Sequence, residues 1–187
     1  MQRLLSFAIA LLLFGPLAAT VWAHDPYETT MRAYLRAQNF ELRITLNART
    51  VELLLEMEGQ SLTNAAAPEN FEVVRETVTR RAPDWFSVRN AGGVTIPDQV
   101  YVTRGVEDHI EVVMAYRRPP SGVMTFEGAY LKQLPSDEPY GANFSIVDLA
   151  NNVVLGQKVF SATDAVFKTT IPHSARPSAA PSGENKP

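Results

Sequence analysis

Two stretches near the start of the chain alternate strictly between apolar and polar positions. In residues 29–37 the apolar side chains occupy every second position, and residues 40–46 repeat this pattern after a short polar break. Successive side chains of a β-strand point to opposite faces, so alternation over this length predicts two half-buried strands. The short connection between them predicts a β-hairpin.

The chain from Trp85 onward shows the same kind of pattern in shorter pieces. The clearest piece is residues 108–117, where Ile110, Val112 and Met114 share one face. Further strands are predicted at residues 86–88, 94–96, 99–104, 123–131, 144–149, 153–160 and 165–170. About eight to ten short strands at this spacing predict a mainly β domain, an antiparallel, immunoglobulin-like β-sandwich.

Two segments between the first hairpin and Trp85 break the alternation. Residues 68–81 carry apolar side chains at helical spacing (Phe71, Val74 and Val78), which predicts one short helical insertion that Pro83 ends. Residues 51–57 fit either a strand or a helix. We favour a strand, because Glu58 would fall on the apolar side of a helix.

Residues 1–23 have the features of a secretory signal peptide. Arg3 precedes a largely apolar run, and Val21 and Ala23 form a small-residue cleavage site. The alternative is an uncleaved anchor, but the run is shorter than the roughly 20 apolar residues that span a bilayer. We therefore expect a secreted or periplasmic protein with a β domain at residues 24–171. The Pro- and Ser-rich residues 172–187 are predicted to form a disordered tail.

Composition excludes several classes of site. The chain has no cysteine, which excludes disulfides, thiolate metal sites and cysteine nucleophiles. The leader holds one of the 17 basic residues and none of the 20 acidic ones, so cleavage changes the net charge from −3 to −4. A mildly acidic chain without a basic stripe is not expected to bind nucleic acid. No later apolar stretch is long enough to span a membrane.

The histidines carry the only hint of site chemistry. Cleavage after Ala23 makes His24 the first residue, so its α-amine and ring nitrogen lie close enough to chelate one metal ion. A second imidazole, for which His109 is the candidate, would complete a histidine brace, an arrangement suited to copper or nickel. His173 lies in the predicted tail and is not a favoured ligand. The alternative is that His109 is an ordinary surface residue at a strand end.

Later parts of the chain show a family resemblance. The run from Phe126 to Leu131, followed by Leu134-Pro135 and by strands ending at Val147 and beginning at Val153, resembles the exported N-terminal β-domain of HupE/UreJ-type membrane proteins. Members of that family continue into transmembrane helices associated with metal transport, whereas this chain continues into the predicted tail. The resemblance therefore implies an exported β-domain that works near metal ions, and it carries over no transport role.

Taken together, these patterns predict an exported, non-enzymatic protein that binds a metal ion, copper or nickel, through His24 and His109. The contrasting hypothesis is a structural module that docks a protein partner through a sheet edge or face and binds no metal. A copper oxygenase is the third hypothesis, and it would require an open, aromatic-rich surface around His24.

Overall fold

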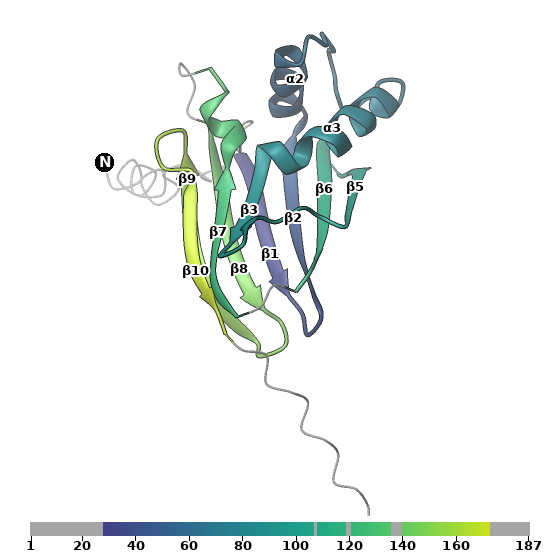
Figure 1. The fold of residues 1–187 in the computed structure, drawn as a ribbon. Helices are drawn as coiled ribbons and strands as arrows, with labels where there is room; N and C mark the ends of the chain where they lie inside the picture. The colour runs from purple at the N-terminus through teal and green to yellow at the C-terminus, as the bar shows by residue number, and fades with distance from the viewer. Residues whose placement is uncertain (1–27, 107, 119–120, 136–139, 173–187) are drawn as a thin grey trace, which may run out of the picture.

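The computed structural model describes residues 28–106, 108–118, 121–135 and 140–172, which form two β-sheets and two helices (Figure 1). The predicted leader, His24 and the predicted tail from His173 onward lie outside the described residues. The strands are β1 (Glu28–Leu35), β2 (Asn39–Asn47), β3 (Phe86–Asn90), β4 (Gly93–Val94), β5 (Gln99–Arg104), β6 (His109–Arg117), β7 (Gly122–Gly128), β8 (Gly141–Asp148), β9 (Val153–Ser161) and β10 (Val166–Ile171). The helices are α2 (Ala48–Met57) and α3 (Phe71–Trp85), with a 3₁₀ turn, η1 (Ala129–Lys132).

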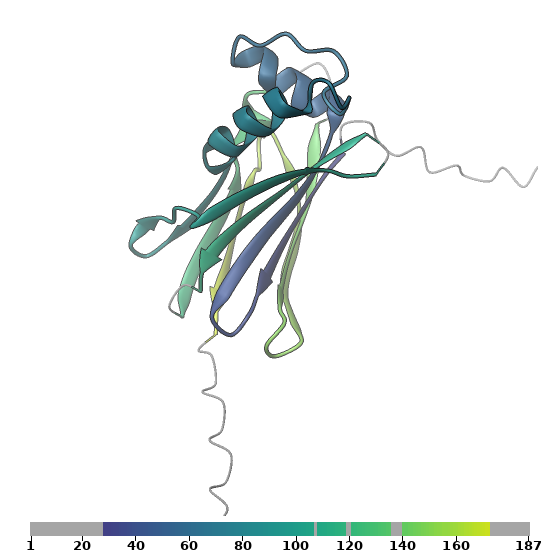
Figure 2. The same cartoon turned by 90° about the vertical axis from the view of Figure 1, so that its right-hand side faces the viewer.

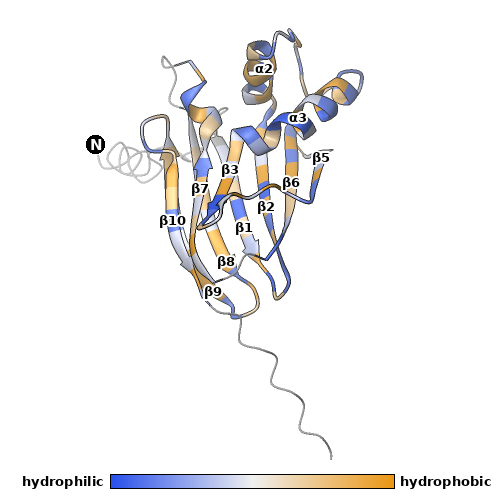
Figure 3. Ribbon diagram, in the orientation of Figure 1, coloured by the Kyte–Doolittle hydropathy of each residue, from blue (hydrophilic) through white to orange (hydrophobic). Residues whose placement is uncertain are grey.

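The larger sheet contains the predicted first hairpin at its centre. Its strand order is β5-β6-β2-β1-β8-β9, and β1 and β2 pair antiparallel as predicted. Strands β2 and β6 show alternating hydrophobic and hydrophilic bands along their length (Figure 3). The apolar positions of β2 are buried and the polar positions are half-buried or exposed. Period-two alternation therefore set the inner and outer faces of this sheet correctly.

The prediction of a purely antiparallel arrangement is wrong at one place. β1 pairs with β8 in parallel, in a register that places Met31 beside Phe144, so the six-stranded sheet is mixed. The chain reaches β8 only after it has formed α2, α3, strands β3 to β7 and η1. A parallel pair needs such a long crossover, and alternation within a strand carries no information about strand direction.

The smaller sheet packs against the larger one through aromatic side chains. Its strand order is β10-β7-β3-β4, and its described pairs are antiparallel. Phe126 of β7 makes an edge contact with Phe40 of β2, with ring centroids 6.5 Å apart, and a closer contact of 4.9 Å with Phe144 of β8. Phe167 of β10 also contacts Phe144, at 5.2 Å. One apolar core therefore joins the two sheets.

The segment for which we favoured a strand forms helix α2 instead. Asn47 caps the helix through its Oδ1 atom, which accepts a hydrogen bond of 2.8 Å from the backbone N–H of Arg49. The helix buries one face, formed by Thr50, Val51, Leu54 and Leu55. Glu58, which argued against a helix, lies just past the helix end and forms an ion pair of 2.8 Å with Arg81 of α3. A charged residue on an apolar side is compatible with a helix when a neighbouring element supplies its partner.

Helix α3 confirms the predicted insertion but is shifted toward the C-terminus. It begins at Phe71 and continues past Pro83 to Trp85, so the predicted end at Pro83 is wrong. The proline lies in the last turn, where the helix loses one hydrogen bond, and the N–H of Phe86 still bonds the carbonyl of Ala82. Trp85 is fully buried, and its burial explains why the last turn persists. Both helices lie at one end of the strands (Figures 1 and 2).

Two predicted strands are shorter than expected. Strand β4 has only two residues, which pair with Arg89 and Asn90 of β3, and the side chains of Val94 and Ile96 are exposed. Strand β7 ends at Gly128, where a Cβ atom would lie 3.2 Å from the ring of Phe160, and the chain then turns into η1. Among the described residues, no helix is both long and apolar enough to cross a membrane.

Gly156 of β9 is expected to tolerate no larger side chain. A Cβ atom at this position would lie 2.3 Å from Cζ of Phe167, whose ring is packed against Phe144. We expect Gly156→Leu to lower the free energy of unfolding by about 1–3 kcal/mol, because the crowded ring must move in the core. Chemical denaturation measures this effect. The control is Val159→Leu, which enlarges an exposed side chain of the same strand and should be nearly neutral. Gly59→Ala would not serve as a control, because Gly59 has a positive φ of 78°.

Candidate functional site

His109 is the one predicted metal ligand within the described residues. It is the first residue of β6 and follows the turn that connects β5 to β6. Its side chain is half-buried on the outer face of the sheet, because the next residue, Ile110, points to the inner face. Its Nδ1 atom lies 2.7 Å from the carbonyl oxygen of Val106.

The contact with Val106 has a consequence for the chemistry of the ring. A carbonyl oxygen only accepts hydrogen bonds, so Nδ1 must carry the proton and donate it to Val106. In a neutral imidazole the other nitrogen, Nε2, then keeps its lone pair. Metal-binding histidines are commonly oriented in this way by a carbonyl partner. The hydrogen bond to Val106 therefore leaves Nε2 of His109 free to donate its lone pair to a metal ion.

Glu111 is a neighbour of His109 on strand β6 that was not among the residues predicted for the site. A Cβ atom built on Gly105 would lie 3.3 Å from both His109 Cβ and Glu111 Oε1. The side chains of His109 and Glu111 therefore both lie next to Gly105. They are two residues apart on β6 and share its outer face. Alternation alone could have identified this pair. It supplies one nitrogen and one carboxylate donor at the same end of the sheet.

The residues with possible donor groups next to His24 and His109 in the sequence are Asp25, Tyr27, Glu107 and Asp108, and of these only Asp108 lies within the described residues. Asp108 is exposed and has a positive φ of 59°, and its carbonyl accepts a hydrogen bond of 3.0 Å from Ala48. His24, Asp25, Tyr27, Glu107 and His173 lie outside the described residues. Within the part of the chain that the structure describes, no three His, Asp or Glu side chains form a cluster able to hold a metal ion.

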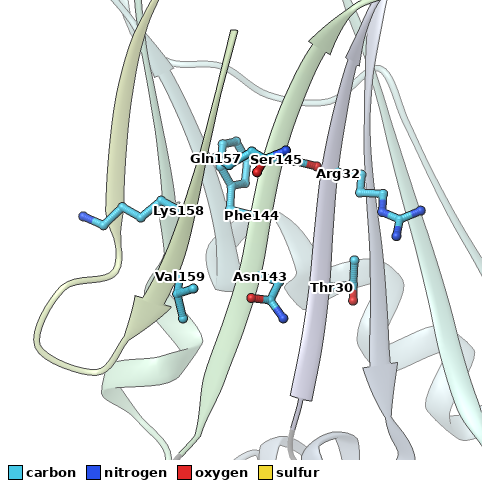
Figure 4. Close-up of a pocket in the computed structure, with 8 residues that line it drawn as sticks. All are labelled: Thr30, Arg32, Asn143, Phe144, Ser145, Gln157, Lys158 and Val159. Carbon is cyan, nitrogen blue, oxygen red and sulfur yellow. The ribbon is translucent and has the colours of Figure 1, made fainter. Parts of the chain in front are cut away.

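The outer face of the larger sheet also contains a polar hollow of about 630 Å³ (Figure 4). Thr30 and Arg32 come from β1, Asn143 and Ser145 from β8, and Gln157 from β9. The ammonium group of Lys158, which also borders the hollow, points away from it and bonds Asp164 and the carbonyl of Val166. The hollow thus offers hydroxyl, amide and guanidinium groups but is open to solvent along the sheet.

A charged cluster on the smaller sheet is built around Glu127 of β7. Its carboxylate bonds Lys132 at 2.6 Å, Arg89 at 3.4 Å and the Ser87 hydroxyl at 3.5 Å. The hydrogen bond from Lys132 is the main cause that lowers the pKa of Glu127 below its usual value, and partial burial opposes this effect. The carboxylate is satisfied by its neighbours, so this cluster ties strands β3 and β7 to η1.

No protein-family model matches the sequence. No curated protein matches it with significant similarity.

Proposed function

We propose that this protein is an exported, non-enzymatic carrier of a divalent metal ion, copper or nickel, which it binds through His24 and His109. In this proposal the β domain is a sandwich-type scaffold that presents the mature N-terminus beside the outer face of the larger sheet. The observation that carries the proposal is the hydrogen bond from His109 Nδ1 to the carbonyl oxygen of Val106. This bond leaves Nε2 as the nitrogen whose lone pair can bind the metal ion.

The register of the sheet supports the pairing of His24 with His109. Asn47 at the end of β2 lies beside His109, and the β1–β2 register brings the first residue of β1 to the same sheet end. The start of β1 is therefore two strands from His109, or roughly 10 Å at the usual strand spacing. His24 precedes β1 by four residues, which span up to roughly 14 Å when extended. The chain is long enough to reach.

The donor set also fits the proposed metals. An α-amine and two imidazoles are nitrogen donors that suit copper and nickel, and the Glu111 carboxylate lies beside His109 as an available oxygen donor. These groups bind a cation only when the nitrogens are deprotonated. We therefore expect metal affinity to fall steeply as the pH drops from about 7 to about 5.

A titration of the mature protein tests this proposal. We expect His109→Ala to weaken Cu²⁺ binding by about tenfold or more, because it removes one of the imidazole donors. One extra residue before His24 should weaken binding to a similar degree, because it destroys the terminal chelate and keeps the ring. Isothermal titration calorimetry against a competing chelator measures both effects.

The control for this titration is a change in the exposed turn that leaves the donors in place. Val106→Ala keeps the backbone carbonyl that orients His109 and should bind as the unaltered protein does. Affinity that is unchanged in both the His109→Ala variant and the extended protein would reject the metal site.

The second hypothesis, a protein-interaction module, is favoured by a separate observation. Strand β5 forms an edge of the larger sheet, and Tyr101 on its outer side is 52% exposed. Elemental analysis of protein purified from its native compartment separates the two hypotheses. A stoichiometric metal content supports the carrier, and its absence together with a co-purifying protein supports the module.

A further inference from the structure

Strand β5 lies at an edge of the larger sheet. Its hydrogen bonds to β6 determine which of its backbone groups point away from the sheet. The N–H of Gly105 bonds the carbonyl of His109 at 2.8 Å. In an antiparallel ladder every second residue bonds the same partner, so the backbones of residues 99, 101 and 103 face β6. The N–H and C=O groups of Val100, Val102 and Arg104 therefore point away from the sheet.

A hydrogen bond on the other side of β6 confirms which residues of β6 face β5. The N–H of Ala48 bonds the carbonyl of Asp108, so the even-numbered residues of β6 face β2 and the odd-numbered residues face β5. Figure 2 looks onto the β5 edge, and no other described strand or helix lies in front of it. The three outward-facing residues thus offer six backbone groups to a further strand.

The opposite edge of the same sheet is protected, which makes the β5 edge distinctive. Strand β9 contacts β10, and Lys158 and Thr169 form hydrogen bonds across the gap, to the carbonyls of Val166 and Leu155. The β8–β9 pair also contains a register shift at Ile146/Val147. Such bulges and edge lysines are common protections against strand addition. Strand β5 itself contains no lysine and no proline.

We propose that strand β5 pairs with β5 of a second copy of this chain, which joins the two six-stranded sheets into one. Pairing must connect outward-facing residues and must keep the inner faces of both sheets on the same side. Both conditions are met when Val102 lies opposite Val102 of the second copy and Val100 opposite Arg104. This isologous contact makes six backbone hydrogen bonds about a two-fold axis.

The side chains in this register are compatible with each other. Tyr101 lies opposite Thr103 of the second copy on the outer face, and an aromatic side chain beside a β-branched one is a favourable cross-strand pair. The charged Arg104 lies opposite Val100, so no like charges are opposed. A hollow of about 550 Å³ between β5 and the α3 residues Glu72, Glu76 and Thr79 leaves space beside the strand. The proposal depends on no metal ion and stands independently of the carrier function.

Charge variants at two exposed positions of β5 test the register. Tyr101→Glu combined with Thr103→Glu places like charges opposite each other twice, and we expect it to weaken dimerisation by about tenfold or more. Tyr101→Lys combined with Thr103→Glu changes the same positions but places opposite charges together, and we expect it to keep the dimer. Sedimentation equilibrium across the micromolar range measures both dissociation constants.

Cysteine cross-linking gives an independent readout, because the natural chain has no cysteine. A mixture of the Tyr101→Cys and Thr103→Cys proteins should form a disulfide-linked dimer, whereas each protein alone should link poorly. A mixture of Tyr101→Cys with Val159→Cys, at an exposed position on the protected edge, should not link. An unaltered protein that stays monomeric throughout the concentration range, or equal dissociation constants for the two charge variants, would overturn the proposal.

Discussion

Asp148→Ala is expected to lower the free energy of unfolding by about 3–5 kcal/mol, because it leaves a largely buried cation without its partner. Asp148 at the end of β8 is fully buried, and its carboxylate lies 3.6 Å from the guanidinium of Arg118, whose side chain is only 7% exposed. The same carboxylate accepts hydrogen bonds from the backbone of Ala150 and from the side chain of Asn151. Removing it therefore disrupts the β8–β9 turn as well as the ion pair. Urea denaturation followed by circular dichroism measures the loss.

Asp164→Ala is the matched control for this experiment. Asp164 also pairs with a cation, Lys158 at 2.5 Å, but its side chain is 67% exposed. Exposed ion pairs contribute about 0–1 kcal/mol, so the control should unfold nearly as the natural protein does. A loss of less than about 1 kcal/mol for Asp148→Ala would show that the buried pair does not stabilise the fold.

The same residue makes stability depend on pH in a defined direction. Burial alone would raise the pKa of Asp148, but hydrogen bonds from Asn151 and Ala150 and the charge of Arg118 outweigh burial and lower this pKa. A carboxyl group whose pKa is lower in the folded state contributes stability above its unfolded pKa of about 3.9. That contribution is lost as the pH falls below about 4 toward the folded pKa. The pKa of Glu127 is also lowered, so the stability that Glu127 contributes is likewise lost as the pH falls.

The strands could be predicted because alternation reports a one-sided environment directly. In β6 the apolar positions predicted to share a face, Ile110, Val112 and Met114, are all buried. Helix α2 was missed because its ambiguity depended on Glu58, whose partner Arg81 lies 23 residues away. The parallel pairing of β1 with β8 was missed for a similar reason, since it depends on contacts that are distant in sequence. Local patterns specify faces, whereas order and direction follow from the packing of the whole chain.

The candidate site was only half predictable for the same physical reason. The position of His109 at a strand end and on the outer face followed from its place opposite Ile110. Its hydrogen bond to Val106 did not, because it depends on the backbone path of the turn before β6. The edge of β5 was likewise invisible in the sequence, since a strand becomes an edge only when no other element pairs beside it.

Phe126→Ala is expected to lower the free energy of unfolding by about 3–5 kcal/mol and to weaken both sheets together. Phe126 is fully buried on β7, and its ring contacts Phe40 and Phe144 of the other sheet. Truncation removes buried apolar area and leaves a cavity between the sheets, and both effects destabilise the folded state. Trp85 is the only tryptophan after the predicted cleavage site, and it adjoins the smaller sheet. Its fluorescence therefore follows that sheet, while circular dichroism follows both.

If one core joins the sheets, the fluorescence and circular dichroism transitions of Phe126→Ala should move to lower urea concentration together, because two-state unfolding gives coincident curves. Val159→Ala is the control, since Val159 is 70% exposed on β9 and its truncation should change the stability by less than about 0.5 kcal/mol. Two separate transitions, with only the fluorescence curve shifted, would show that each sheet folds on its own. In that case the contacts of Phe126 with Phe40 and Phe144 would not connect the two sheets energetically.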